Sequence, residues 1–351
     1  MRRCVRATRI SAVLVVLAAA LAGMPAAAHA QDIPAAPSPT PTSPPSFAEW
    51  LIEVRTEALA RGIRQDVVDS ALTDLTPVSQ ILERDRTQAE FSLDLTAYLK
   101  RRLTRSTLRT ARDMYKEHAA LLKSVGAKYG VPARVITAVW GLESNFGRFA
   151  GVRPTIPALA TLAYDPRRAP MFRNELFSAL EIVNRGDIEL ERLRGSWAGA
   201  LGQPQFMPST YLKFSQDFDG DGRRDIWGSL ADVFASIAFY LREHGWTDGT
   251  TWGREVRVPK ASRKAIASIP RRDSGCRAER ALTKPLPLKE WRKRGVRTLS
   301  GAPLPATALD ASVVTDGVRY FLVYRNYEAL LAYNCATSYA ISIGMLSDRL
   351  K

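Results

Sequence analysis

The sequence has 351 residues, of which 46% are hydrophobic and 24% are charged. These proportions are typical of a globular protein with a well-buried core, and they exclude a disordered or fibrous chain. The net charge of +15 favours anionic partners, but no basic run with interleaved aromatic residues indicates nucleic acid.

The first thirty residues have the three parts of a cleaved secretory signal. Four arginines come first: Arg2, Arg3, Arg6 and Arg9. An apolar run from Ile10 to about Leu21 follows, and it is too short to span a bilayer comfortably. A small-residue site then predicts cleavage after Ala30, with an uncleaved N-terminal anchor as the alternative. We therefore expect an exported protein without membrane insertion after cleavage.

Cleavage of the signal changes both the net charge and the number of cysteines. Four arginines and no acidic residue leave with the signal, so the mature chain carries a charge of +11. Cys4 leaves as well, and the mature chain keeps only Cys276 and Cys335. Because exported proteins fold under oxidising conditions, we predict a disulfide between them.

The remaining chain divides into a linker and three folded parts. Residues 31–46 hold six prolines and form a semi-rigid linker. Apolar residues recur at helical spacing from Phe47 onward, and one helix is expected from about Ala111 to Gly130. We expect a helical part over about 47–130, a central core over about 131–250 and an α/β part over about 251–351. The predicted fold class is therefore mainly α, with a small β-containing C-terminal part.

A predicted helix between Pro132 and Gly147 carries the first candidate catalytic residue. Glu143 continues the apolar stripe of this helix, three residues after Trp140. Burial and the negative end of the helix dipole both raise the pKa of a carboxyl group at this position. A raised pKa suits a general acid for glycosidic cleavage, whereas a partly buried Glu in an ordinary ion pair is the alternative.

A glycine-rich stretch from Gly195 to Tyr211 is the second candidate element. Its small residues allow close approach of the backbone, and Ser196, Gln205 and Phe206 offer hydrogen bonds and an aromatic surface to a sugar. A tight packing turn is the alternative. The stretch holds no Asp or Glu, so it cannot supply the second carboxylate of an ordinary glycosidase. A distant carboxylate such as Asp165 or Glu175 remains an open alternative.

An acidic loop follows, and its spacing is similar to that of an EF-hand calcium loop. The candidate metal residues are Asp217, Asp219, Asp221, Arg223 and Asp225. Gly228 occupies the position of the usual bidentate Glu, so a loop closed by Asx turns is the alternative. A weak structural calcium ion is the cofactor that this loop predicts, and catalysis is not expected to need it.

Beyond Trp252 the pattern changes to strands, over 255–258 and 320–324, before a final helix over 340–350. Only two histidines remain in the mature chain, and no P-loop, dinucleotide-binding fingerprint or nucleophile elbow is present. These absences argue against a multi-His zinc site and a Ser-His-Asp triad, which leaves carboxylate chemistry.

Three ordered motifs resemble those of the membrane-bound lytic murein transglycosylase B family. They are 143-ESNFG-147, then 199-GALGQPQFMPS-209, then 331-LAYN-334 with Tyr339. The resemblance covers the chain from about Phe47 to Leu350. It implies a lysozyme-like fold, a periplasmic location and cleavage of peptidoglycan glycan strands between N-acetylmuramic acid and N-acetylglucosamine.

The resemblance also implies residue roles. Glu143 is expected to act as the single acid and base, with the muramyl C6 hydroxyl attacking C1 to give a 1,6-anhydro end. The expected substrate-binding residues are Ser196, Gln205, Phe206, Tyr240, Tyr333, Asn334 and Tyr339. No protein partner is indicated. The rival functions are a hydrolytic muramidase and a non-catalytic peptidoglycan-binding scaffold.

Overall fold

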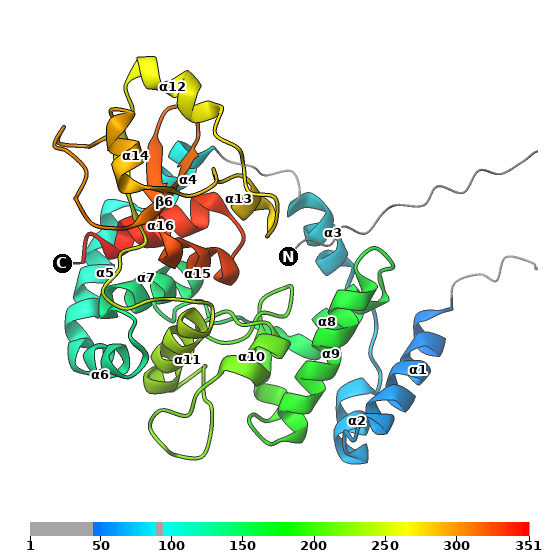
Figure 1. The fold of residues 1–351 in the computed structure, drawn as a ribbon. Helices are drawn as coiled ribbons and strands as arrows, with labels where there is room; N and C mark the ends of the chain where they lie inside the picture. Colours follow the sequence, from blue (N-terminus) through cyan, green and yellow to red (C-terminus); the bar gives the residue numbers. More distant parts are fainter. Residues whose placement is uncertain (1–44, 89–93, 351) are drawn as a thin grey trace, which may run out of the picture. The chain divides into compact units, whose positions relative to one another are not determined.

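The fold is mainly helical with a small antiparallel sheet, as the sequence predicts (Figure 1). The computed structural model describes residues 45–88 and 94–350. The predicted signal sequence and nearly all of the linker lie outside these residues. From Pro45 onward, the described part of the chain forms one unit.

The N-terminal part consists of six helices within the described residues. They are α1 (Phe47–Ala60), α2 (Gln65–Leu72), α3 (Ser79–Gln88), α4 (Leu95–Arg102), α5 (Arg105–Glu117) and α6 (Ala119–Tyr129). The start of α1 at Phe47 is confirmed, and a capping box between Ser46 and Glu49 defines it.

The single helix expected over Ala111–Gly130 is wrong, because the chain turns between α5 and α6. His118 leaves helical geometry with φ −103° and ψ 19°. Its ring lies 5.7 Å from that of Trp140 and 6.0 Å from that of Phe234. These aromatic contacts at the corner have no signature in the local sequence, so helical periodicity alone could not place the break.

The central part is built around α7 (Ala133–Ser144), which packs against α5, α6, α11 and α16. Its other elements are β1 (Arg153–Pro154), α8 (Thr155–Tyr164), α9 (Ala169–Asn184), a short 3₁₀ helix (Leu190–Arg192), β2 (Arg194–Gly195), α10 (Pro208–Phe214) and α11 (Leu230–Glu243). Every residue of α7 from Val135 to Ser144 except Glu143 is buried. The helix that carries the candidate acid is therefore the centre of the main core.

The C-terminal part contains a five-stranded antiparallel sheet in the order β4-β6-β7-β3-β5. Its strands are β3 (Gly253–Arg257), β4 (Leu286–Pro287), β5 (Arg297–Thr298), β6 (Asp310–Thr315) and β7 (Tyr320–Val323). The strands predicted over 255–258 and 320–324 correspond to β3 and β7. The helices are α12 (Lys260–Ala267), α13 (Arg277–Arg280), α14 (Leu288–Lys293), α15 (Arg325–Tyr333) and α16 (Thr337–Ser347). The final helix therefore begins and ends three residues earlier than expected.

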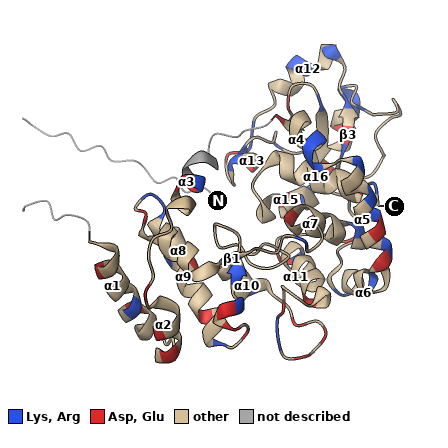
Figure 2. Cartoon of the chain, turned by 180° about the vertical axis from the view of Figure 1, so that it is seen from behind, with Lys and Arg blue, Asp and Glu red and all other residues tan. Residues whose placement is uncertain are grey.

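Residues 251–324, which we call the sheet module, have a hydrophobic core of their own. Trp291 of α14 is fully buried there, and its indole N–H donates to the carbonyl oxygens of Leu286 and Ala311. Lysines and arginines lie along α12 and next to β3 in this module (Figure 2). The module therefore has both a separate core and a basic surface.

No single helix of the described residues is long and apolar enough to cross a membrane. Taken together, α15 and α16 have the length and apolar composition of a membrane-spanning segment, but a bend of 117° separates them.

Candidate active site

Glu143 lies at the C-terminal end of α7, one residue before the helix ends. The chain then leaves the helix through two non-glycine residues with positive φ, Asn145 at 50° and Phe146 at 59°. The Phe146 ring lies 5.4 Å from the ring of Trp140 and folds back over Gly141, where a Cβ atom would approach the ring to 2.5 Å. This packed corner fixes the position of Glu143.

The Glu143 carboxyl group is mostly enclosed by protein, is partly exposed toward a pocket, and accepts one short hydrogen bond. The Tyr339 hydroxyl of α16 donates to Glu143 Oε1 at 2.5 Å. Burial raises the pKa of Glu143 to about 7, although the Tyr339 hydrogen bond and the charge of Arg102 act in the opposite direction. Burial and Glu143 also raise the pKa of Tyr339, so its hydroxyl keeps its proton and stays a donor. The raised pKa predicted for Glu143 from its helix position is confirmed.

Two residues of α4 complete this environment, and the sequence analysis missed both. A guanidinium nitrogen of Arg102 donates to the carbonyl oxygen of Leu142, directly beside Glu143. The Tyr98 side chain of the same helix is close enough to both Arg102 and Glu143 for their charges to affect its pKa, which burial raises. The residues lie about forty positions before Glu143 in a segment without a recognisable motif, so only the fold brings them together.

Glu143 lines a pocket of about 280 Å³ at the surface of the molecule. The other residues that line it include Arg101, Arg102, Thr107, Asn145 and Phe149. Phe149 is 67% exposed, which is unusual for a phenylalanine. The pocket therefore places a carboxylic acid with a near-neutral pKa beside an arginine pair and an exposed aromatic ring.

The glycine-rich stretch folds into a tight loop that packs against α7. Backbone hydrogen bonds link Ser196 to Ala200 and Leu201 to Phe206. Gln203, another residue that the sequence analysis missed, accepts from the Trp140 indole at 2.7 Å and donates to the Trp227 carbonyl oxygen at 2.8 Å. The loop is thus held in register with the catalytic helix by a buried amide.

The predicted aromatic residues form a connected group between this loop and α16. The Tyr333 hydroxyl donates to the Pro204 carbonyl oxygen at 2.7 Å, and its ring lies 6.4 Å from the ring of Tyr339. Phe206 and Tyr240 pack against Tyr333 with ring centroids 5.8 and 4.8 Å away. Phe206 and Tyr240 are buried, so in this structure they support Tyr333 from behind.

The other predicted binding residues have no hydrogen bond to Glu143 among the described residues. The Ser196 hydroxyl accepts from the amides of Ala198 and Ala200, and the Gln205 side chain donates to Gly202, so both groups hydrogen-bond within their own loop. Gln205 has a positive φ of 56°. Asn334 is exposed at the end of α15. The structure brings Tyr333 and Tyr339 to Glu143, whereas Ser196, Gln205 and Asn334 have no hydrogen bond to it among the described residues.

The two carboxylates considered as second catalytic groups are engaged elsewhere. Glu175 is buried and accepts from the amide and hydroxyl of Ser209, which fixes the start of α10. Asp165 pairs with Arg167 at 2.6 Å. The groups that shift the pKa of Glu143 are Tyr339 and Arg102, and no carboxylate is among them. The described residues therefore offer one acid at this site.

The acidic loop has features both of a calcium-binding loop and of a loop closed by Asx turns. Oxygens of Asp217, Asp219 and Asp221 lie within 4.8 Å of one another, as oxygen ligands of a hard cation would. The same carboxylates accept backbone amides of the loop, as in Asx turns. Asp225 instead accepts the amides of Trp227 and Gly228, and Arg223 is exposed. Three carboxylates therefore fit a cation, and Asp225 does not join them.

Asp232, which the sequence analysis did not consider, closes the acidic loop from inside. It is fully buried and accepts the amides of Phe218 and Asp225 at 2.7 and 2.8 Å. Burial raises the pKa of Asp232 to about 6, against the effect of these two hydrogen bonds. Its position three residues after the helix-capping Ser229 is the local signal that could have identified it.

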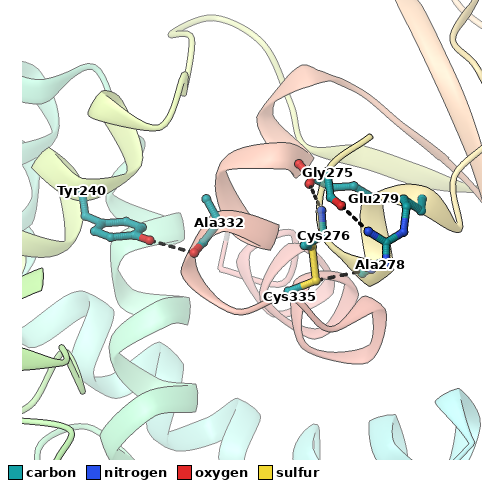
Figure 3. Close-up of a disulfide and its surroundings, with 8 residues drawn as sticks. Tyr240, Gly275, Cys276, Ala278, Glu279, Ala332 and Cys335 are labelled. Atoms are coloured by element: carbon teal, nitrogen blue, oxygen red, sulfur yellow. Dashed lines mark hydrogen bonds between the residues drawn. A yellow bond between two sulfur atoms is a disulfide. The ribbon is translucent and has the colours of Figure 1, made fainter. Parts of the chain in front are cut away.

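Cys276 and Cys335 form a disulfide (Figure 3). The bond joins the N-terminus of α13 in the sheet module to the segment between α15 and α16. In the same region, the Tyr240 hydroxyl donates to the Ala332 carbonyl oxygen at 2.7 Å. The segment that carries Tyr333 and Tyr339 is therefore fixed from both sides.

The fold is that of lysozyme-like enzymes that cleave glycans. The model of the transglycosylase SLT domain family matches residues 46–348, and the chain belongs to this family. Membrane-bound lytic murein transglycosylase B of Escherichia coli (strain K12) is 28% identical over 259 residues. That alignment covers 72% of this chain and 66% of the relative, so this chain spans about two thirds of the relative's length.

Solved structures give a closer likeness. SltB3 from Pseudomonas aeruginosa, in complex with NAG-anhNAM-pentapeptide, is 38% identical with a TM-score of 0.80, over 87% of this chain and 79% of that one. The Escherichia coli lytic transglycosylase Slt35 in complex with calcium is 23% identical with a TM-score of 0.72, over 86% of this chain and 92% of that one. The second likeness shows the fold alone.

Proposed function

We propose that the chain is a lytic transglycosylase that cleaves the β-1,4 bond between N-acetylmuramic acid and N-acetylglucosamine in peptidoglycan and leaves 1,6-anhydromuramyl ends. The observation that carries this proposal is the isolation of Glu143, a single acid with a pKa of about 7. Membership of the SLT family and the SltB3 complex with an anhydromuramyl ligand support the substrate and the product.

The proposed reaction uses Glu143 twice. Protonated Glu143 first donates its proton to the glycosidic oxygen while the bond between C1 and that oxygen breaks. The resulting carboxylate then accepts the proton of the muramyl C6 hydroxyl as that oxygen bonds to C1. The proton returns to Glu143 and no water is consumed. A pKa near neutrality suits both steps, because neither protonation state is strongly disfavoured.

Tyr339 and Arg102 have supporting roles in this proposal. The Tyr339 hydroxyl orients the carboxyl group through its hydrogen bond and stabilises the carboxylate form. The guanidinium of Arg102 also favours the carboxylate after the proton has left. Burial raises the pKa of Glu143, whereas Tyr339 and Arg102 lower it. The balance of these effects sets the pKa of about 7.

The substrate-binding residues are also a proposal. We assign Tyr333 to direct contact with the sugars next to Glu143, with Asn334 at the exposed edge. Tyr339 is buried, so of the predicted binding residues it acts through its hydrogen bond to Glu143. Ser196 and Gln205 present the glycine-rich loop to the glycan, and Phe206 and Tyr240 hold Tyr333 in place. Tyrosines suit such a site because they combine an apolar ring face with a polar hydroxyl group.

Two rival functions predict different products. A hydrolytic muramidase would cleave the same bond with water and release reducing ends. A non-catalytic scaffold would bind peptidoglycan and release nothing, but pure binding gives no reason for a buried acid whose pKa is tuned to neutrality.

The test is mass spectrometry of soluble fragments released from purified peptidoglycan by the chain and by Glu143→Gln. The proposal predicts anhydromuramyl ends from the wild type and a rate lower by about 10²- to 10⁴-fold from the variant. Glu175→Gln is the matched control, because it removes a buried carboxylate that accepts hydrogen bonds from Ser209. Reducing ends would support the muramidase, and no release by the wild type would contradict both enzymes.

A calcium ion is proposed for the acidic loop as a weak structural ligand. The carboxylates of Asp217, Asp219 and Asp221 would hold it. Of the other two predicted residues, Asp225 accepts the amides of Trp227 and Gly228 instead, and Arg223 offers only its backbone oxygen. The proposed reaction does not use the ion. Calorimetry of chelator-treated chain should show a higher melting temperature when calcium is added, and an Asp219→Asn variant should lose that response. An equal response in the variant would contradict the assignment.

The cellular location and the domain boundaries follow from the proposed substrate and from the N-terminal sequence pattern. We propose a periplasmic protein, because its proposed substrate is a cell-wall polymer and its N-terminus has the pattern of a cleaved signal. We further propose a signal over 1–30, a linker over 31–46 and a transglycosylase domain over 47–351. N-terminal sequencing of the exported chain should begin at Gln31, and recovery of the full-length chain from the inner membrane would contradict cleavage.

A further inference from the structure

The net charge of the chain is concentrated in one region. Residues 31–250, which include Glu143, hold 27 basic and 27 acidic residues and are neutral overall. The sheet module, residues 251–324, holds 16 basic and 6 acidic residues, a net charge of +10. A charge needed only for solubility has no reason to collect in a fifth of the chain.

Within the module, two arginines face each other across neighbouring strands. Arg257 of β3 pairs in register with Arg297 of β5, which is an edge strand of the sheet. Like charges directly opposite each other destabilise an antiparallel pair. The repulsion between Arg257 and Arg297 therefore destabilises this strand pair, and an anionic ligand would offset it.

The arginine pair lines a surface pocket of about 590 Å³. Arg263 of α12 and Arg319 also line it, and Glu255 is the one acidic residue among the lining. Glu255 already accepts two hydrogen bonds from Arg319, at 2.7 and 2.5 Å. Within the described residues, the acid of this pocket is therefore committed to Arg319, and Arg257, Arg263 and Arg297 are left without an acidic partner there.

The same pocket has an apolar side. Val318 and Leu299 are 79% and 49% exposed at its edge, and the Tyr320 ring lies 5.5 Å from the guanidinium of Arg263. Arginine binds carboxylates through paired N–H groups, and small exposed apolar side chains suit methyl groups. The pocket therefore matches a short peptide that carries a free carboxylate.

We propose that the Arg257, Arg263 and Arg297 pocket of the sheet module is a second, non-catalytic site that binds the free carboxylate of a peptidoglycan peptide. This inference rests on the proposed function, because it takes the ligand from the polymer on which Glu143 acts. Two sites on one polymer raise the effective concentration of glycan at the active site without a new catalytic contact. The module then holds the enzyme on the wall while the neutral part performs the chemistry.

The test uses the full chain with Glu143→Gln, so that binding is measured without cleavage, by co-sedimentation with purified peptidoglycan sacculi. Adding Arg257→Glu and Arg263→Glu together should weaken binding by about tenfold or more. The matched control is Lys123→Glu with Lys213→Glu, which changes the charge equally at exposed positions of α6 and α10. It should change binding by less than about twofold. A version with Arg257→Gln and Arg263→Gln should give an intermediate loss and guards against misfolding of the charge-reversed chain.

Modified sacculi identify the group that is bound. Amidation of their carboxylates should weaken binding of the Glu143→Gln chain to the level of the charge-reversed variant. Equal binding by that variant, or equal binding to amidated sacculi, would overturn the proposal. Binding to phosphatidylglycerol vesicles that exceeds binding to sacculi would overturn it in favour of a lipid surface. Failure of the proposed function has a separate signature, because the wild type would then release no anhydromuramyl ends.

Discussion

The part of the chain that carries Glu143 and the sheet module use charge in opposite ways. The residues 31–250 that include Glu143 are neutral overall, and its carboxyl group is mostly enclosed beside Tyr339 and two arginines. The module leaves several arginines exposed on a small sheet with a core of its own. Burial tunes one proton in the first region, whereas exposed charge offers long-range attraction in the second.

The disulfide ties the sheet module to the segment between α15 and α16, next to Tyr333, and removing it has the largest effect we predict. Cys276→Ala with Cys335→Ala opens a loop that separates the two cysteines by 59 positions. In the chain-entropy model this lowers the free energy of unfolding by about 4 kcal/mol. Chemical denaturation measures the loss. An unchanged midpoint in the double variant would show that the two regions hold together without the bond.

Neutralising Glu143 tests the cost of burying its charge. The pKa of Glu143 is about 7 in the folded chain against 4.5 for a free side chain, so the folded state binds the proton more tightly. The resulting stabilisation is complete below about pH 4.5 and is lost as the pH rises through 7. Glu143→Gln should therefore be more stable than the wild type at pH 8, by on the order of 3 kcal/mol, and equal to it near pH 4. Thermal melts at both values decide this, and a difference independent of pH would contradict it.

Removing the hydroxyl of Tyr339 tests how the acid is held. Tyr339→Phe keeps the ring and removes the hydrogen bond to Glu143, which should lower kcat by about 10- to 100-fold. The pKa of Glu143 should rise, because the lost bond favoured the carboxylate. Tyr327→Phe is the control, since its hydroxyl is buried but contacts Thr337. An unchanged kcat in Tyr339→Phe would remove this tyrosine from the site.

The charge of Arg102 has the smallest predicted effect, a shift in pH dependence. Without it the pKa of Glu143 should rise, so the decline of kcat at alkaline pH should move to higher pH in Arg102→Ala. Arg102→Lys should restore part of the wild-type profile. Arg101 lines the same pocket but has no hydrogen bond to α7 among the described residues. The pH profile of Arg101→Ala should therefore match that of the wild type. Identical profiles for the two alanine variants would show that Arg102 acts only structurally.

The sequence predicted the residues whose role is local. Glu143 was identifiable because helical spacing placed it on the apolar stripe of α7, and the start of α1 followed from the apolar residues that recur at helical spacing from Phe47 onward. Arg102 and Gln203 were not, because each acts across the fold on a helix far away in the chain. The break at His118 likewise depends on aromatic contacts with other helices.

The glycine-rich loop shows a second limit of sequence reasoning. Residue types predict Ser196 and Gln205 as sugar ligands, a prediction that stays open, and their side chains also hydrogen-bond within the loop. Short polar residues beside glycines serve loop closure as readily as ligand binding, and the two uses have the same sequence signature. The charge of the sheet module was visible in the composition, but the pairing of Arg257 with Arg297 required the strand register.

The central claim is that Glu143 acts alone and that the substrate supplies its own nucleophile. Digestion of purified peptidoglycan in water enriched in ¹⁸O tests this directly by mass spectrometry of the released muramyl ends. We predict anhydromuramyl products without ¹⁸O, because the C6 oxygen of the sugar bonds to C1. Muramyl ends that each carry one ¹⁸O atom would show that water attacks C1 and would contradict the account.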